Sequence, residues 1–286
     1  MSQGGSMKTT VPITSERLGV PGASLYYEVR GSGPVLLMMP GGPADAGAFR
    51  RIAQNLASDY TVVTYDPRGL SHSTLEGSVQ DERIVEIFAD DVHRLLSATA
   101  TEPAFIFASS GGAVIGLELA ARHPEQVRTL VSHEPPAPAL LPDTARERVA
   151  MEEIYQTYRT AGIGPAMQKF MVQTRIRSGP PPAPQGEPTP EMREAMAQLQ
   201  RNMDFWLGHY FRSIAAYEPD FDALKAGSAR IVPAVGEESQ GELAHEGGLG
   251  LAKRLGTPAA VFPGAHGGFD THAVEFAARL REVLEG

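Results

Sequence analysis

The stretch FIFASSGGAVIG, Phe105–Gly116, joins a run of apolar residues to a glycine-rich turn that contains two serines. Its first four residues predict a buried strand, and the residues after the glycines predict a helix. A nucleophilic serine between such a strand and helix occupies a strained turn, in which the positions two before and two after must be small. Ala108 and Gly112 meet this requirement around Ser110, whereas centring the turn on Ser109 would place a phenylalanine there. The pattern predicts Ser110 as a nucleophile, and a helix-capping serine is the alternative.

Strand and helix patterns alternate along most of the chain. Amphipathic patterns predict helices at 49–56, 84–95, 114–122 and 273–284. Apolar runs predict strands at 25–29, 35–39, 60–65, 105–108, 127–132, 230–235 and 259–262. Strands that are apolar on both faces and alternate with helices are typical of a mostly parallel sheet covered on both sides, so we expect an α/β fold.

The alternation stops between residues 137 and 226, where helical patterns occur without a convincing strand, interrupted by the proline-rich segment GPPPAP at 179–184. We therefore expect a core formed by 24–136 and 227–286, with a helical lid at 137–226 inserted after the sixth strand. Residues 1–23 are interpreted as a flexible leader and the entry to the first strand.

Composition limits the classes of partner. The formal net charge of −9 does not favour binding to nucleic acid or to an anionic membrane surface. The absence of cysteine excludes disulfides, thiolate chemistry and cysteine-ligated metals. No apolar run is long enough to span a bilayer and no signal peptide is recognisable. We expect a cytoplasmic protein that uses no cofactor, and the sequence does not indicate its oligomeric state.

A serine nucleophile needs a histidine base and an acid that orients the base. Of the eight histidines, His266 lies in the glycine-rich segment PGAHGG after the last predicted strand, where it can reach the sheet edge that carries Ser110. Glu134 follows the strand predicted to lie beside the elbow strand, so it is the preferred acid. Glu238, after the penultimate strand, is the second candidate. His245 is assigned to a polar stretch without a catalytic role.

Backbone N–H groups are expected to stabilise the oxyanion of an acyl-transfer reaction. Gly111, directly after the nucleophile, supplies one. The second is expected from the segment PGGP at 40–43, and because Pro43 has no N–H, Gly42 is preferred over Gly41.

Two other motifs that these segments suggest do not fit the sequence. A dinucleotide-binding G-x-G-x-x-G cannot be aligned on the elbow without serine or alanine at a glycine position. The pair His133 and Glu134 suggests a zinc-binding H-E-x-x-H helix, but the second histidine is absent and the prolines at 135 and 136 forbid the helix. No metal site is predicted.

These segments resemble the α/β-hydrolase superfamily of capped, single-domain enzymes. PGGP resembles its H-G-G-P loop, with proline in place of histidine, and DPRG at 66–69 resembles its D-x-R-G loop. The segments SSG at 109–111, HE at 133–134 and PGAH at 263–266 are together similar to the zearalenone lactonases. That resemblance implies Glu134 as the triad acid, and Trp206 as a pocket residue. In many members of the superfamily an aspartate follows the penultimate strand, where this chain has Ser239.

The sequence therefore predicts a serine hydrolase that cleaves an ester or lactone of a bulky apolar small molecule through an acyl-enzyme. Its apolar lid supplies Trp206, Phe205 and Tyr210 as expected substrate-binding residues. A slow-turnover ligand receptor on the same fold, or a cofactor-free lyase or perhydrolase, are the alternatives.

Overall fold

The computed structural model describes residues 11–177 and 187–286, so the proline-rich segment at 179–184 lies outside the described residues, as does the beginning of the expected leader. The described strands form one nine-stranded sheet. They are β1 (Ile13–Val20), β2 (Ala23–Gly31), β3 (Val35–Met39), β4 (Thr61–Tyr65), β5 (Thr74–Leu75), β6 (Ala104–Ser109), β7 (Val127–His133), β8 (Arg230–Gly236) and β9 (Ala260–Phe262).

The sheet has the order β1-β2-β4-β3-β6-β7-β8-β9, and the short β5 pairs with β2. From β4 to β9 all neighbours are parallel, whereas β1, β2 and β5 pair in antiparallel fashion. The expected mostly parallel sheet is thus confirmed. Because β3, β6, β7 and β8 are parallel neighbours, their carboxyl ends lie along one edge, where we expect functional side chains to meet.

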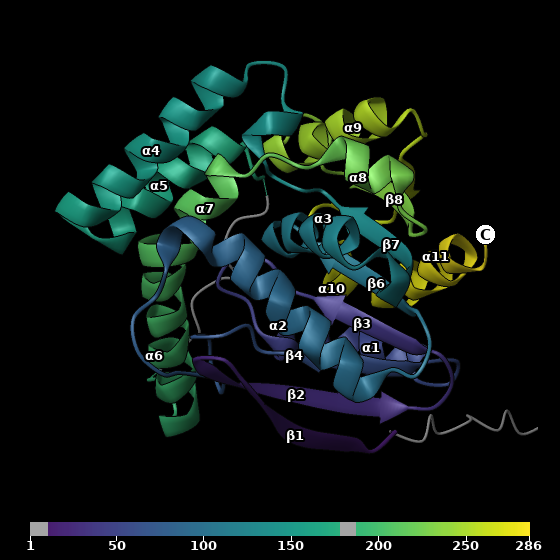
Figure 1. Ribbon diagram of the computed structural model, residues 1–286. Helices are drawn as coiled ribbons and strands as arrows, with labels where there is room; N and C mark the ends of the chain where they lie inside the picture. Colours follow the sequence, from purple (N-terminus) through teal and green to yellow (C-terminus); the bar gives the residue numbers. More distant parts are fainter. Residues whose placement is uncertain (1–10, 178–186) are drawn as a thin grey trace, which may run out of the picture.

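Helices cover both faces of the sheet (Figure 1). One core packs α2 and α3 against the sheet, together with α9 and the inserted helices, and the other packs α1 and α11 against the opposite face. The core helices are α1 (Arg50–Leu56), α2 (Ile84–Thr99), α3 (Gly111–Arg122), α9 (Leu243–Leu255), α10 (Gly268–Thr271) and α11 (Ala273–Glu285). Helix α9 is not among the helices that the sequence patterns predict.

A helical segment connects β7 to β8, and β7 is the sixth strand when the two-residue β5 is not counted. Its described helices are α4 (Thr144–Ala161), α5 (Ile163–Thr174), α6 (Pro190–Phe205), the π-helix η5 (Trp206–Tyr210), α7 (Phe211–Ala216) and α8 (Phe221–Ala226). Figure 1 shows α4, α5 and α7 stacked at one end of the sheet, with α6 descending along its side. We keep the name lid for this segment.

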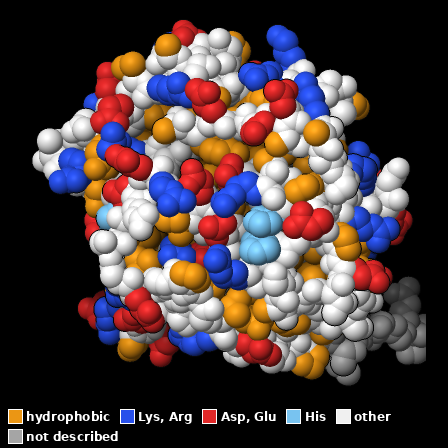
Figure 2. Space-filling model, viewed as in Figure 1, with side chains coloured by type: hydrophobic (Ala, Val, Ile, Leu, Met, Phe, Trp, Pro, Cys, Tyr) orange, Lys and Arg blue, Asp and Glu red, His pale blue; other side chains and the backbone are white. Residues whose placement is uncertain are grey.

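The surface carries both signs of charge. On the face seen in Figure 2, basic and acidic side chains are intermixed, with apolar side chains scattered between them. Among the described residues, no helix combines the length and apolarity that crossing a membrane would require.

Candidate active site

Ser110 lies in the sharp turn between β6 and α3, with φ of 57° and ψ of −128°. A serine rarely adopts this conformation, and such strain persists only where surrounding contacts hold it. The Ser110 N–H donates to the carbonyl of His133 at 2.9 Å, and the Ser110 carbonyl accepts from the N–H of Ala113 at 2.9 Å. Strand β7 on one side and the first turn of α3 on the other therefore fix the turn.

The residues around the turn are small because neighbouring atoms leave no room for larger side chains. A Cβ on Gly112 would lie 2.5 Å from the carbonyl oxygens of Met39 and Pro40. A Cβ on Gly116 would lie 3.2 Å from Cβ of Ala108, so these two positions pack directly against each other. Helix α3 thus crosses the sheet at a distance that only small side chains permit.

His266 contacts Glu134 directly. Its Nδ1 lies 2.6 Å from Oε2 of Glu134, and the glutamate is fully buried while the imidazole keeps 25% of its side-chain surface exposed. The other carboxylate oxygen, Oε1, accepts from the N–H of Gly236 at 2.8 Å and from the hydroxyl of Ser239. Every charge-bearing oxygen of Glu134 therefore has a donor, as a buried carboxylate requires.

These contacts set the protonation state of Glu134. Burial acts to raise the pKa of its carboxyl, but the hydrogen bond from His266, nearby histidine charge and the hydrogen bond from Ser239 together lower the pKa to about 2. Burial also lowers the pKa of His133 to about 4, so this fully buried imidazole is neutral at pH 7. At neutral pH the hydrogen bonds, rather than a charge on His133, hold Glu134 ionised.

The second acid candidate and one histidine differ from expectation. Glu238 is exposed, and it is Glu134 that contacts His266. His245 is buried on α9, with its Nδ1 3.1 Å from the hydroxyl of Ser239 and 3.7 Å from Oε1 of Glu134. The assignment of His245 to a polar stretch was wrong, because α9 packs its Leu243 side against the core. The hydroxyl of Ser239 thus links His245 to Glu134, a role that no local motif indicates.

Ser110 and His266 line the same pocket, together with Gly42 and Gly111. The rest of its lining is mostly apolar and comes from the lid and from α9, and its volume is about 50 Å³. These further lining residues are Pro136, Met151, Phe170, Thr174, Ile176, Trp206, Phe211, Ile214, Ala215, Leu243 and Ala244. The pocket therefore joins the nucleophile candidate and the histidine candidate beneath the lid.

The two glycines of the loop after β3 play different parts. A Cβ on Gly41 would lie 2.6 Å from Cβ of Ser110 and from the N atom of Gly111, so the loop approaches the elbow at a distance that only glycine allows. Gly42 has φ of +60° and lines the pocket. Gly111 is the first residue of α3, where backbone N–H groups lack partners within the helix.

The DPRG loop supports this arrangement. Asp66 accepts from the N–H of Ala46 at 2.9 Å and from the N–H of His72 at 2.8 Å, which ties the loop after β4 to the loop after β3. Arg68 forms a buried ion pair with Asp91 of α2, with Nε 2.6 Å from Oδ2. Asp66 therefore braces the loop after β3, and Arg68 anchors its own loop to α2.

The three expected substrate-binding residues lie in different places. Trp206 lines the pocket. Phe205 packs instead on the DPRG loop, where a Cβ on Gly69 would lie 2.6 Å from its ring, so the structure does not bring Phe205 to the pocket. Tyr210 does not line the pocket either, but its hydroxyl lies against Gly111, 2.6 Å from the position that a Cβ there would take.

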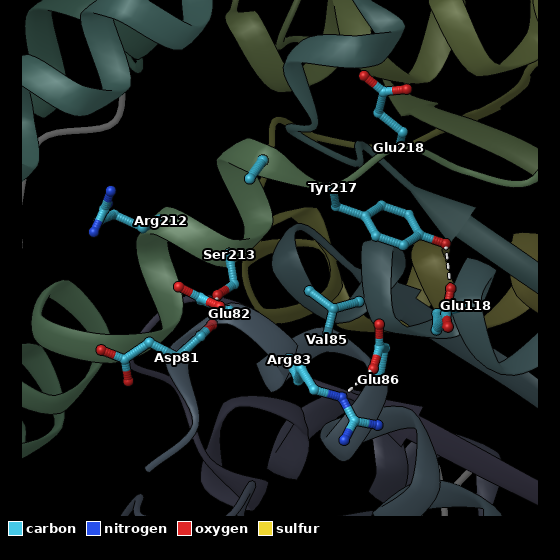
Figure 3. Close-up of a pocket in the computed structure, with 11 residues that line it drawn as sticks. Asp81, Glu82, Arg83, Val85, Glu86, Glu118, Arg212, Ser213, Tyr217 and Glu218 are labelled. Atoms are coloured by element: carbon cyan, nitrogen blue, oxygen red, sulfur yellow. Dashed lines mark hydrogen bonds and ion pairs between the residues drawn. The ribbon is translucent and has the colours of Figure 1, made fainter.

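A larger hollow lies elsewhere, between the beginning of α2, α3 and α7 (Figure 3). It has a volume of about 470 Å³, is open, is lined by many charged residues, and contains none of the predicted site residues. Tyr217 donates there to Glu118, and Arg83 pairs with Glu86, as Figure 3 shows. Within residues 11–177 and 187–286, no group of three or more histidine and carboxylate side chains is arranged to hold a metal ion.

Comparisons with known proteins agree with this fold. The chain is 37% identical over 281 residues to an uncharacterized hydrolase, YraK, of Bacillus subtilis (strain 168), covering 96% of this chain and 97% of that protein. It is 24% identical over 270 residues to a zearalenone hydrolase of Bionectria ochroleuca, covering 92% and 95% of the two chains.

Solved structures share the architecture. A hydrolase from Pseudomonas aeruginosa PA01 superimposes with a TM-score of 0.73 at 19% identity, covering 95% of this chain and 98% of that one. A thermophilic esterase from Thermogutta terrifontis superimposes with a TM-score of 0.71 at 18% identity, covering 94% and 98%. Residues 34–162 match the family described as alpha/beta hydrolase fold. With a relative of 37% identity along nearly its whole length, the chain belongs to the α/β-hydrolase family.

Proposed function

We propose that the protein is a serine hydrolase that cleaves carboxylic esters or lactones of bulky apolar small molecules. The observation that carries the proposal is that Ser110 and His266 line one pocket while His266 contacts the buried carboxylate of Glu134. In this assignment Ser110 is the nucleophile, His266 the base and Glu134 the group that orients the base.

The proposed reaction follows from these positions. The free ring nitrogen of His266 takes the proton of the Ser110 hydroxyl as its oxygen attacks the substrate carbonyl, and Glu134 holds the other ring nitrogen in its N–H form. The N–H groups of Gly42 and Gly111 donate to the oxyanion. Protonated His266 then gives its proton to the departing alcohol oxygen, which leaves an acyl-enzyme. Water attacks the acyl carbon, with His266 again as base, and frees the acid and Ser110.

The apolar lining supports an apolar substrate. Met151, Phe170 and Trp206 from the lid face the same space as Ser110, and aromatic and thioether side chains suit a hydrophobic ligand. The cavity of about 50 Å³ is far smaller than the several hundred Å³ of a typical ligand site. A bulky substrate therefore requires the lid to move outward before it can bind. The likeness to a zearalenone hydrolase supports a lactone as well as a linear ester.

The test uses two adjacent serines. Purified wild-type protein is incubated with p-nitrophenyl esters and with a fluorophosphonate, and the labelled peptide is identified by mass spectrometry. Ser110→Ala should abolish both turnover and labelling while the protein still folds, because the change removes one hydroxyl from a turn. Ser109→Ala is the matched control, because Ser109 is buried and does not line the pocket. Its hydroxyl oxygen lies 3.4 Å from Nδ1 of His133 instead.

Two outcomes of these experiments would contradict the proposal. Turnover that Ser110→Ala leaves unchanged would reject the assignment of the nucleophile. Labelling of Ser110 with tight ligand binding but almost no turnover would reject the hydrolase and favour the alternative of a receptor on the same fold.

A further inference from the structure

The hydroxyl of Tyr210 is buried without a partner. The side chain is 1% exposed, and its hydroxyl makes no hydrogen bond with any described residue. A buried polar group left unpaired costs about 1–3 kcal/mol, so most such groups in proteins have a partner. The hydroxyls of Tyr155, Tyr158 and Tyr217, also in the lid, each have one: Arg159, Asp204 and Glu118, respectively.

Two contacts fix where the Tyr210 hydroxyl lies. The ring stacks on Phe88 of α2, with ring centroids 5.1 Å apart and an angle of 29° between the planes. The hydroxyl then ends against Gly111, where a Cβ would lie only 2.6 Å away. Gly111 follows Ser110 directly and lines the same pocket, so the unpaired hydroxyl is held beside the nucleophile turn, although Tyr210 itself is not among the residues that line the pocket.

The backbone around Tyr210 is also unusual. Trp206–Tyr210 forms the π-helical segment η5 between α6 and α7. A π-turn inserts an extra residue into a helix and is frequently found at functional sites. Here the segment directs Trp206 into the pocket lining while Tyr210 packs against the elbow.

We propose that the Tyr210 hydroxyl donates a hydrogen bond to the carbonyl oxygen of the substrate at Ser110, as a third oxyanion donor beside Gly42 and Gly111. This role rests on the proposed function. No proton is transferred: the O–H stays on tyrosine, and its hydrogen bond strengthens as the carbonyl oxygen gains negative charge during attack by Ser110. Burial raises the pKa of Tyr210 well above its usual value, which keeps the phenol protonated at neutral pH.

The donor would come from the lid half of the site. Gly42 and Gly111 belong to the core, whereas Tyr210 belongs to the lid. If the lid moves outward to admit substrate, the full set of three donors forms only when it has returned. Lid closure and oxyanion stabilisation would then be one event.

The test compares Tyr210→Phe with Tyr155→Phe. Both variants remove one hydroxyl from a largely buried lid tyrosine, but the hydroxyl of Tyr155 lies 3.2 Å from Arg159 rather than at the elbow. We expect Tyr210→Phe to lower kcat on a p-nitrophenyl ester about 10²-fold with KM little changed, as for loss of one oxyanion donor. A trifluoromethyl ketone, which forms a tetrahedral adduct with serine, should bind more weakly by a similar factor. Tyr155→Phe should leave both quantities unchanged.

The thermal midpoint separates this role from a structural one. Removing an unpaired hydroxyl should leave the midpoint of Tyr210→Phe unchanged or raise it. A raised KM with unchanged kcat, or a lowered midpoint with unchanged kinetics, would overturn the oxyanion role. Failure of the wild-type protein to be labelled at Ser110 would overturn the proposed function and this role together, whereas unchanged kcat in a labelled Tyr210→Phe variant would overturn this role alone.

Discussion

Nδ1 of His266 lies 2.6 Å from Oε2 of Glu134, although 132 positions separate the two residues in the chain. Glu134 directly follows β7, whose last residue, His133, accepts the N–H of Ser110 through its carbonyl. The end of one strand thus contacts both the proposed nucleophile turn and the proposed base. Glu134 also has φ of 53°, so it shares with Ser110 a positive φ that is rare for non-glycine residues.

The first prediction concerns the acid. Glu134→Gln keeps the shape of the side chain but removes the charge that orients His266, so kcat for an ester should fall about 10³- to 10⁴-fold. Glu238→Gln, at the exposed second candidate, is the matched control and should retain full activity. Steady-state kinetics measured on both variants shows which of the two glutamates serves as the acid. Equal activity of Glu134→Gln and wild type would show that this contact does not serve the reaction.

Much of this arrangement could be predicted from local sequence. The elbow around Ser110 has steric requirements that a few adjacent residues express, and the placement of His266 and Glu134 follows from the rule that parallel strands end at one edge. Such rules depend on strand order and on small residues, both of which can be recognised along the chain.

Side chains in the lid could not be placed in this way. Phe205 and Trp206 are neighbours in the chain, and adjacent side chains on a helix point about 100° apart, so the two do not face the same space. The π-turn of Trp206–Tyr210 also changes the register of the residues that follow it. Phe205 therefore packs on Gly69, and Phe211 lines the pocket instead. Ser239 and His245 were missed for another reason: their contacts with Glu134 depend on the approach of α9, which no local motif encodes.

The second prediction concerns stability in mild acid. The folded pKa of His133 is about 4, below the ordinary value of 6.5, so between these values the unfolded chain binds a proton that the folded protein does not. The free energy of unfolding should therefore fall as pH drops from 6.5 to 4, by about 3 kcal/mol in all. It should not depend on His133 above pH 6.5.

Urea unfolding at a series of pH values tests this. His133→Gln should have a flatter dependence than wild type between pH 6.5 and 4.5, and the same dependence between pH 7 and 8. Glu134 acts in a lower window, because its folded pKa of about 2 lies below the ordinary 4.5 and its contribution is lost as pH falls through that range. Parallel curves for the two proteins between pH 6.5 and 4.5 would contradict the assignment to His133.

The third prediction concerns the attachment of the lid to the core. Asn202 of α6 is buried, donates to the carbonyl of Pro43 at 3.0 Å and to the hydroxyl of Ser71 at 2.9 Å, and accepts from the N–H of Ser71 at 3.0 Å. Asn202→Ala removes the partner of the Pro43 carbonyl and of the Ser71 N–H, so it should destabilise the protein by about 1–3 kcal/mol.

Gln198→Ala is the control for Asn202→Ala, since Gln198 lies one turn earlier on α6 and, among the residues that the structure describes, forms hydrogen bonds only with Asn202 and Arg201. Thermal unfolding should show a clear drop in the midpoint for Asn202→Ala and a small change for Gln198→Ala. Equal midpoints for the two variants would mean that the bonds to Pro43 and Ser71 contribute little to holding the lid.

The fourth prediction follows from the position of Ser239. Its hydroxyl donates to Oε1 of Glu134, whose other oxygen contacts His266, so a carboxylate carried by residue 239 would extend toward the space that the Glu134 carboxylate now fills. Glu134→Gly empties that space and suits the positive φ at this position. Glu134→Gly alone should lose activity as severely as Glu134→Gln, because no charge then orients His266.

Adding Ser239→Asp to Glu134→Gly should raise kcat at least about tenfold above that of Glu134→Gly alone. This is part of the full effect of a triad acid. The control is Ser239→Asn in the same background, which has nearly the same shape without the charge and should restore nothing. Recovery specific to aspartate would establish that His266 requires an anion at this place rather than Glu134 itself. If Ser239→Asn restores kcat as much as Ser239→Asp does, His266 does not depend on a buried anion, and the orienting role assigned to Glu134 is wrong.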